Sequence, residues 1–134
     1  MKNAYAKTAS VYTSLARICP DATIEDASIL RRAEITLHRW AEQECGDSND
    51  YASWAIERDE QTGKPFMVRY PHKGESRRTA IPDREAGALK RVRAVCARLG
   101  LHFFQQSDPR GCALYVSNEP LTDSDYNRGV AICA

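Results

Sequence analysis

The sequence of 134 residues lacks any long apolar run. Its apolar stretches are only a handful of residues long, as in Val130 to Ala134, whereas a membrane-spanning helix needs about 20 apolar residues. The N-terminus also lacks the charged start and following apolar run of a secretory signal. We therefore expect a cytoplasmic protein that does not contact a membrane.

Cysteine is present, but the spacing of the cysteines matches no metal-binding motif and no disulfide framework. The five cysteines are odd in number, and no two are closer than 16 residues. This spacing excludes a CxxC metal knuckle and argues against a disulfide framework. We expect reduced thiols that are buried or half-buried.

Motifs for cofactors and metals are missing as well. Glycines are scattered, and no G-x-G-x-x-G or GK[ST] loop is present, so no nucleotide cofactor is expected. The histidines, His38, His72 and His102, include no pair with the i, i+3 or i+4 spacing of a helical metal site. We therefore expect no metal and no cofactor.

Neither sign of charge is in excess over the whole chain. Nineteen Lys and Arg against eighteen Asp and Glu give a net charge of +1, which excludes a strongly basic nucleic-acid packer and an acidic mimic of DNA. The length suits one compact domain. We expect a single domain over residues 1–134, with an N-terminal helical extension at 1–22 and an α+β core at 23–134.

Three segments have the apolar spacing of amphipathic helices. In the second segment Leu30, Leu37 and Trp40 lie on one stripe, and Thr23 precedes Asp26 by three residues as in a capping box. The predicted helices cover residues 3–19, 23–46 with Gly46 as C-terminal cap, and 83–100 with Asp83 as N-cap and Gly100 as C-terminal cap.

Elsewhere the apolar period changes to two, which is typical of strands. Trp54 and Ile56 lie two apart in one segment, and Phe66 and Val68 do so in the next. We expect strands at 51–58, 65–70, 79–81, 101–106 and 112–117, a tight turn at 107–111, and one helical turn at 122–128. The order α-α-β-β-α-β-β-α predicts an α+β fold: a two-layer sandwich whose antiparallel sheet, built from two hairpins, has helices on one face.

Charge is segregated along the chain. Residues 1–63 carry a net charge of −4, residues 64–98 one of +7, and the remainder one of −2. The basic segment 64–98 is the predicted binding surface, with Tyr70 or His72 available for stacking on a base. Its candidate residues are Arg69, Lys73, Arg77, Arg78, Arg84 and Arg91. The alternative is a solvated helix face that contacts the acidic half of the protein.

A second candidate contact is Arg110, at the tip of the turn from Asp108 to Gly111. Pro109 fixes φ and Gly111 accepts a positive φ, so both build the turn. The turn does not require an arginine. The guanidinium group of an arginine can form two parallel hydrogen bonds with a carboxylate or a phosphate. We therefore predict a binding role for Arg110.

An enzymatic function is the least favoured interpretation that stays open. Cys45 with His38 or His102 would form a nucleophile and a base only if the fold brought them together. Acidic residues gather in a polar loop and at a helix start, but the lysine that accompanies such acids in two-metal nucleases is missing. These acids are Glu57, Asp59, Glu60, Asp83 and Glu85. We predict no catalytic residue.

Four blocks of the sequence resemble a family of small bacteriophage and prophage proteins. The blocks are Leu37 to Trp40 with Glu44 to Asp47, Ile56 to Glu60 with Thr62 to Pro65, Ile81 to Glu85, and Asp108 to Val116. The resemblance covers roughly residues 30–117. It implies an accessory gene of a phage or prophage, whose products often bind host machinery, and it brings no catalytic residues.

The resemblance and the charge pattern together give two expectations about function. The first is a non-catalytic protein that binds a host protein or a protein–nucleic acid complex and so interferes with host processes, including defence. The alternative is a nucleic-acid-binding accessory protein that uses the basic segment 64–98. Neither expectation fixes the oligomeric state.

Overall fold

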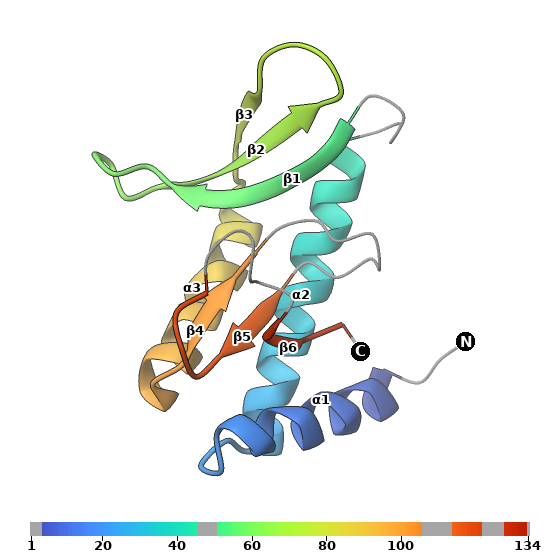
Figure 1. Ribbon diagram of the computed structural model, residues 1–134, viewed down its shortest axis with the longest axis vertical. Helices are drawn as coiled ribbons and strands as arrows, with labels where there is room; N and C mark the ends of the chain where they lie inside the picture. Colours follow the sequence, from blue (N-terminus) through green and yellow to red (C-terminus); the bar gives the residue numbers. More distant parts are fainter. Residues whose placement is uncertain (1–3, 46–50, 106–113, 122–127, 134) are drawn as a thin grey trace.

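The computed structural model describes residues 4–45, 51–105, 114–121 and 128–133 (Figure 1). The helices are α1 (Ala4–Ile18), α2 (Ile24–Cys45) and α3 (Asp83–Leu99). The strands are β1 (Tyr51–Arg58), β2 (Pro65–Pro71), β3 (Arg77–Ala80), β4 (His102–Phe104), β5 (Tyr115–Ser117) and β6 (Val130–Ala131). All pairings among them are antiparallel. The predicted α+β class is confirmed.

Helices α2 and α3 form the centre of the fold, side by side and antiparallel (Figure 1). Their apolar stripes, with Leu30 and Leu37 on α2 and Leu89 and Val92 on α3, are almost completely buried in one core. Burial of side chains of this size stabilises the fold by about 1.5–3 kcal/mol each. Helix α1 crosses the start of α2 and adds Val11 and Leu15 to the same core (Figure 1).

The strands are divided between two sheets. Sheet A has the order β1-β2-β3 and lies at the end of the helix pair where α2 finishes and α3 starts, whereas sheet B has the order β4-β5-β6 and lies across the two helices (Figure 1). The facing edges β1 and β4 are joined where the Ile56 N–H donates to the Gln105 carbonyl oxygen at 3.1 Å. The two predicted hairpins therefore each gain a third strand and do not merge into one sheet.

The predicted start of α2 is confirmed in atomic detail. The Thr23 hydroxyl accepts from the Asp26 N–H at 3.1 Å, and the Asp26 carboxylate accepts from the Thr23 N–H at 2.9 Å. These reciprocal hydrogen bonds form a capping box, which satisfies two backbone donors that the helix itself leaves without acceptors.

The predicted ends of α3 are half right. Gly100 is the C-terminal cap in the left-handed conformation, with φ of 70°. The N-cap, however, is Pro82 and not Asp83, because Pro82 is extended (ψ of 160°) and its carbonyl already accepts from the Ala86 N–H at 2.8 Å. Asp83 is therefore inside the first turn. Its negative charge there interacts favourably with the helix dipole, but its side chain makes no capping hydrogen bond.

Strand bounds differ from the predictions mainly by length. Strand β1 matches, β3 begins two residues earlier, and β4 and β5 are shorter than expected. The end of the chain, predicted only as apolar, contributes β6 to sheet B. The cap at Gly46, the turn at 107–111 and, apart from Arg128, the helical turn at 122–128 lie outside the described residues. None of the described helices combines the length and the apolar character needed to cross a membrane.

Candidate functional site

The outer face of sheet A is defined by strand register. Glu57 pairs with Phe66 and Ala55 with Val68, and Val68 also pairs with Arg78. Paired residues, and residues two apart on one strand, share a face of a sheet. The side chains on this outer face are therefore Ala55, Glu57, Phe66, Val68, Tyr70 and Arg78. The opposite face, with Trp54 and Met67, is buried against the core.

Three exposed cations of the predicted surface lie on the β2–β3 hairpin: Lys73 in the connection, and Arg77 and Arg78 on β3. We call these residues the hairpin cations. Because successive side chains of a strand alternate, Arg78 lies on the outer face and Arg77 on the opposite one, at the free edge of the sheet. No ion pair of Lys73 or Arg77 is formed within the described part of the chain.

Arg78 is held above an aromatic ring. Its guanidinium carbon lies 4.5 Å from the centroid of the Phe66 ring, in the range of a cation–π contact. This contact restrains the position of the guanidinium above the ring. The exposed Arg78 is therefore preorganised to bind an anion.

Arg69, the fourth candidate, has a different position. It is half-buried, and one guanidinium nitrogen donates to the Glu44 carbonyl oxygen at 2.9 Å. That carbonyl belongs to the last turn of α2, where backbone acceptors lack helical partners. Arg69 therefore joins sheet A to the end of α2, a contact that no local pattern predicts because Glu44 is 25 residues away.

The remaining candidates, Arg84 and Arg91, are exposed on α3. Residues seven apart lie on nearly the same helix face, so these two arginines and Arg98 follow one line along α3. Arg98 is not available to a partner, because it forms an ion pair with Asp26 at the start of α2. The exposed cations of the predicted surface thus come from two elements, Arg84 and Arg91 from α3 and the hairpin cations from the β2–β3 hairpin.

Arg93 belongs to neither part. It is half-buried, and both burial and the nearby positive charge of Arg58 lower the pKa of its guanidinium. Arg110, the predicted contact at the hairpin tip, lies outside the described residues, as does the turn that contains it.

The four described cysteines fit the expected thiols. Cys19 and Cys96 are buried, and Cys45 and Cys133 are half-buried. Burial raises the pKa of Cys45 despite the opposing charge of Arg69, and burial raises the pKa of Cys96 to about 12. Both thiols are therefore protonated at neutral pH, which is the unreactive form.

His38 is not positioned as a base for Cys45. The two residues are seven positions apart on α2, so a helix rise of about 10 Å separates them. His38 instead lies 3.5 Å from Glu34 and 3.3 Å from Glu42 through its two ring nitrogens. Glu34, 2% exposed, also pairs with Arg31 at 2.7 Å, so these side chains form an ionic network along one side of α2.

The acidic loop has a structural role in the β1–β2 connection. The Asp59 carboxylate accepts from the N–H groups of Gln61 and Thr62 at 2.8 and 2.9 Å, and these bonds lower the pKa of Asp59. This is the turn-building use of an aspartate. Within the described residues, no three His, Cys, Asp or Glu side chains gather as a metal-binding group.

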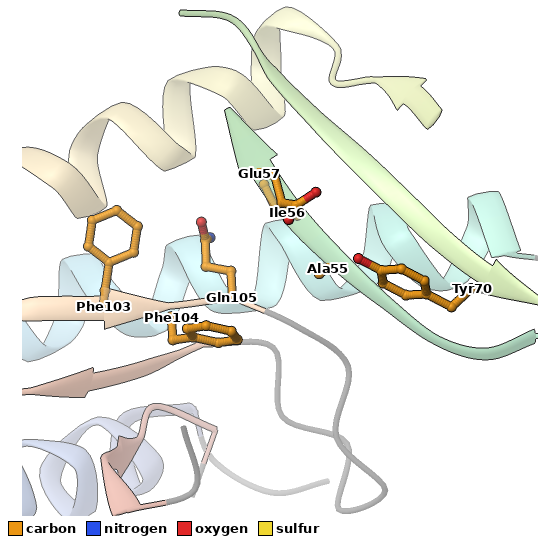
Figure 2. Close-up of a pocket in the computed structure, with 7 residues that line it drawn as sticks. All are labelled: Ala55, Ile56, Glu57, Tyr70, Phe103, Phe104 and Gln105. Carbon is orange, nitrogen blue, oxygen red and sulfur yellow. The ribbon is translucent and has the colours of Figure 1, made fainter. Parts of the chain in front are cut away.

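A pocket that the sequence did not predict lies between the two sheets. It has a volume of about 220 Å³ and is lined by Ala55, Ile56, Glu57 and Tyr70 of sheet A and by Phe103, Phe104 and Gln105 next to it (Figure 2). The sequence predicts a strand at 101–106, and residues two apart on a strand, such as Phe103 and Gln105, share a face. Nothing in the sequence indicates that this strand meets β1.

We compared the chain with protein-family models, curated proteins and solved structures, and none of the three comparisons gave a match.

Proposed function

We propose that this chain is a non-catalytic accessory protein of a bacteriophage or prophage, and that it interferes with host processes by binding a host macromolecule through the hairpin cations. The phage setting comes from the resemblance of four sequence blocks. The observation that carries the binding role is the contrast between two groups of arginines. Arg31 and Arg98 pair with buried carboxylates, whereas Arg77 and Arg78 are exposed on β3 and form no ion pair within the described residues.

Exposed arginines of this kind are suited to an anionic partner. Arginine forms paired hydrogen bonds with carboxylate or phosphate oxygens, and it loses less freedom on binding when its position is already fixed. The cation–π contact with Phe66 fixes Arg78 in this way. The hairpin cations therefore place exposed positive charge along β3, with Arg78 held by an aromatic contact.

Single-stranded nucleic acid is the class of macromolecule that we favour. Tyr70 is 40% exposed and shares the outer face of sheet A with Phe66 and Arg78. Proteins that bind single strands combine aromatic rings, on which bases stack, with cations that follow the phosphates. A host protein with an acidic surface would need the cations but not the exposed ring.

The test is binding of labelled single-stranded DNA and RNA, and of the corresponding duplexes, followed by fluorescence anisotropy. We expect the single strands to bind, with affinity falling as the salt concentration rises, because phosphate contacts release counterions. The double variant Arg77→Glu/Arg78→Glu should abolish this binding and keep the fold. Arg32→Glu/Arg39→Glu on α2 changes the charge equally at exposed positions and should bind like the parent.

Two other results would redirect or reject the proposal. Capture of a host protein that resists nuclease treatment and is lost only in the Arg77→Glu/Arg78→Glu variant would identify a protein partner for the same surface. If both double variants bound every partner as the parent does, the hairpin cations would not be the contact surface.

A further inference from the structure

The buried amide of Gln105 is the unexplained group of the pocket between the sheets. Gln105 is 5% exposed, and its backbone oxygen accepts from the Ile56 N–H. Its side-chain nitrogen, Nε2, has no hydrogen-bond acceptor within the described part of the chain. Because a buried donor without an acceptor is costly and rare in native proteins, such a group points to a missing partner.

One acidic residue and several aromatic residues line the same pocket as Gln105. The Glu57 carboxylate lines it from β1, and no hydrogen bond or ion pair of Glu57 is formed within the described residues. Figure 2 shows that the Tyr70 ring comes from sheet A, and the rings of Phe103 and Phe104 from β4. A ligand that suits the pocket is therefore flat and carries both an acceptor and a donor on its edge.

We propose that this pocket binds one nucleobase of a single-stranded nucleic acid. A base has two aromatic faces for stacking, and its edge can accept from Gln105 and donate to Glu57. Pockets for drug-sized ligands have volumes of about 300–1,000 Å³. At about 220 Å³, this pocket has room for a single ring system.

Other ligands leave part of the pocket without a partner. An alkylammonium group would satisfy Glu57 and the rings, but it carries no acceptor for the Gln105 amide. An aliphatic side chain would satisfy neither polar group. Each nucleobase carries a donor beside an acceptor on its edge, so a base satisfies both polar groups of the pocket.

The hairpin cations near the pocket are the reason to expect a base that is part of an oligonucleotide. Tyr70 lines the pocket and shares the outer face of sheet A with Arg78, one strand away. A strand with one base between Tyr70 and β4 can therefore place its next phosphates beside the hairpin cations. This inference rests on the nucleic-acid binding proposed above.

The test compares two probes that differ only in their bases. Oligonucleotides of about eight residues, the size range bound by one small domain, are prepared with cytosine throughout or as abasic strands with the same phosphates. We expect the cytosine strand to bind at least about fivefold more tightly, the lower end of what one stacked base contributes. Equal binding of both strands would overturn the pocket but keep the phosphate contact, whereas binding of neither would reject single-stranded nucleic acid as the partner in the proposed function.

One pocket variant and one control variant test whether the base lies against Tyr70. Tyr70→Ala removes an exposed ring, and Ile24→Ala removes another large exposed apolar side chain, which lies far away at the start of α2. We expect Tyr70→Ala to reduce the preference for the cytosine strand to less than twofold and Ile24→Ala to leave it unchanged. If Tyr70→Ala keeps the preference, the base does not occupy this pocket.

Gln105→Leu separates binding from folding. The leucine removes the unsatisfied donor and keeps a similar volume, so the melting temperature should stay equal or rise. The same variant should lose the preference for the cytosine strand over the abasic strand. A lower melting temperature with unchanged preference would show that the amide serves the fold alone. A cytidine monophosphate that competes as well as the oligonucleotide would show a site for free nucleotides and overturn the inference for strands.

Discussion

Asp26 and Arg98 form an ion pair that joins the first turn of α2 to the last turn of α3. The Asp26 side chain is 4% exposed and that of Arg98 is 57% exposed. The same carboxylate accepts from the Thr23 N–H in the capping box. One buried carboxylate thus both begins α2 and fixes its position against α3.

Replacement of Asp26 with alanine should lower the free energy of unfolding by about 1–3 kcal/mol, because it removes a helix cap and a charged hydrogen bond. Arg98→Ala should cost about 1 kcal/mol or less, since its side chain is mostly in solvent. Arg91→Ala, on the same line of α3 and with no ion pair among the described residues, is the control and should stay within about 0.5 kcal/mol. Urea unfolding measures all three. A midpoint for Asp26→Ala equal to that of Arg91→Ala would contradict the role of the carboxylate.

The Asp26 carboxylate should also make the stability of the protein depend on pH in the acidic range. Burial raises the pKa of Asp26, but the hydrogen bonds from Thr23 and the charge of Arg98 outweigh burial and lower the pKa below its ordinary 3.8. A carboxyl with a lowered folded pKa stabilises the fold above its unfolded pKa, and this contribution is lost as pH falls through the folded pKa. The melting temperature of the parent should therefore drop more steeply below about pH 4 than that of Asp26→Asn. Parallel curves for the two proteins would show that Asp26 does not titrate with folding.

His38 should make the stability of the protein depend on pH with the opposite sign. The hydrogen bond with Glu34 raises the pKa of His38, burial lowers it, and the charges of Glu34 and Glu42 raise it further, so that the net shift is upward from 6.5. The stabilisation that His38 contributes is complete below its pKa in the unfolded chain. This stabilisation is lost as pH rises through the pKa of His38 in the folded protein. Between pH 6.5 and the alkaline range, the parent should lose stability that His38→Gln does not lose. Thermal unfolding at several pH values checks this, and an equal loss in both proteins would remove His38 from the explanation.

The helix ends show what local sequence can determine. Thr23 and Asp26 cap α2 through atoms only three residues apart, and Gly100 ends α3 because its own φ is positive. Such features depend on neighbours in the sequence, so their pattern predicts them. Pro82 and not Asp83 is the cap because the choice between adjacent residues depends on backbone angles, here the ψ of 160° at Pro82, which the residue types alone do not determine.

Features that join distant segments could not be predicted in the same way. A period of two shows which residues of a strand share a face, but it does not identify the neighbouring strand. The division into two sheets and the pocket between Ile56 and Gln105 follow from tertiary contacts. For the same reason Arg69 and Arg98 were counted as cations of the basic segment, although the fold gives each a fixed partner.

Gly100 and Gly87 should respond to alanine with opposite signs. Gly100 has φ of +70° and open space where a Cβ would lie, so Gly100→Ala costs only conformational strain, about 1 kcal/mol. Gly87 lies inside α3, and its added Cβ would meet Arg91 at 3.6 Å, an ordinary contact. Gly87→Ala should stabilise the protein by up to about 1 kcal/mol. Chemical unfolding measures both, and destabilisation by Gly87→Ala would contradict the helical account of that position.

Arg69 and Arg77 are paired across β2 and β3, yet their substitutions should separate folding from binding. Arg69 donates to the Glu44 carbonyl oxygen at the end of α2, so Arg69→Ala should lower the free energy of unfolding by about 1–2 kcal/mol, as for other hydrogen bonds from charged groups. Arg77 is exposed at the sheet edge, so Arg77→Ala should change stability by less than about 0.5 kcal/mol and weaken binding to single strands. Urea unfolding and anisotropy measure the two effects on the same samples. If instead Arg77→Ala unfolded more easily than Arg69→Ala, or bound single strands as the parent does, the division of this basic segment into fold-stabilising and partner-binding arginines would be wrong.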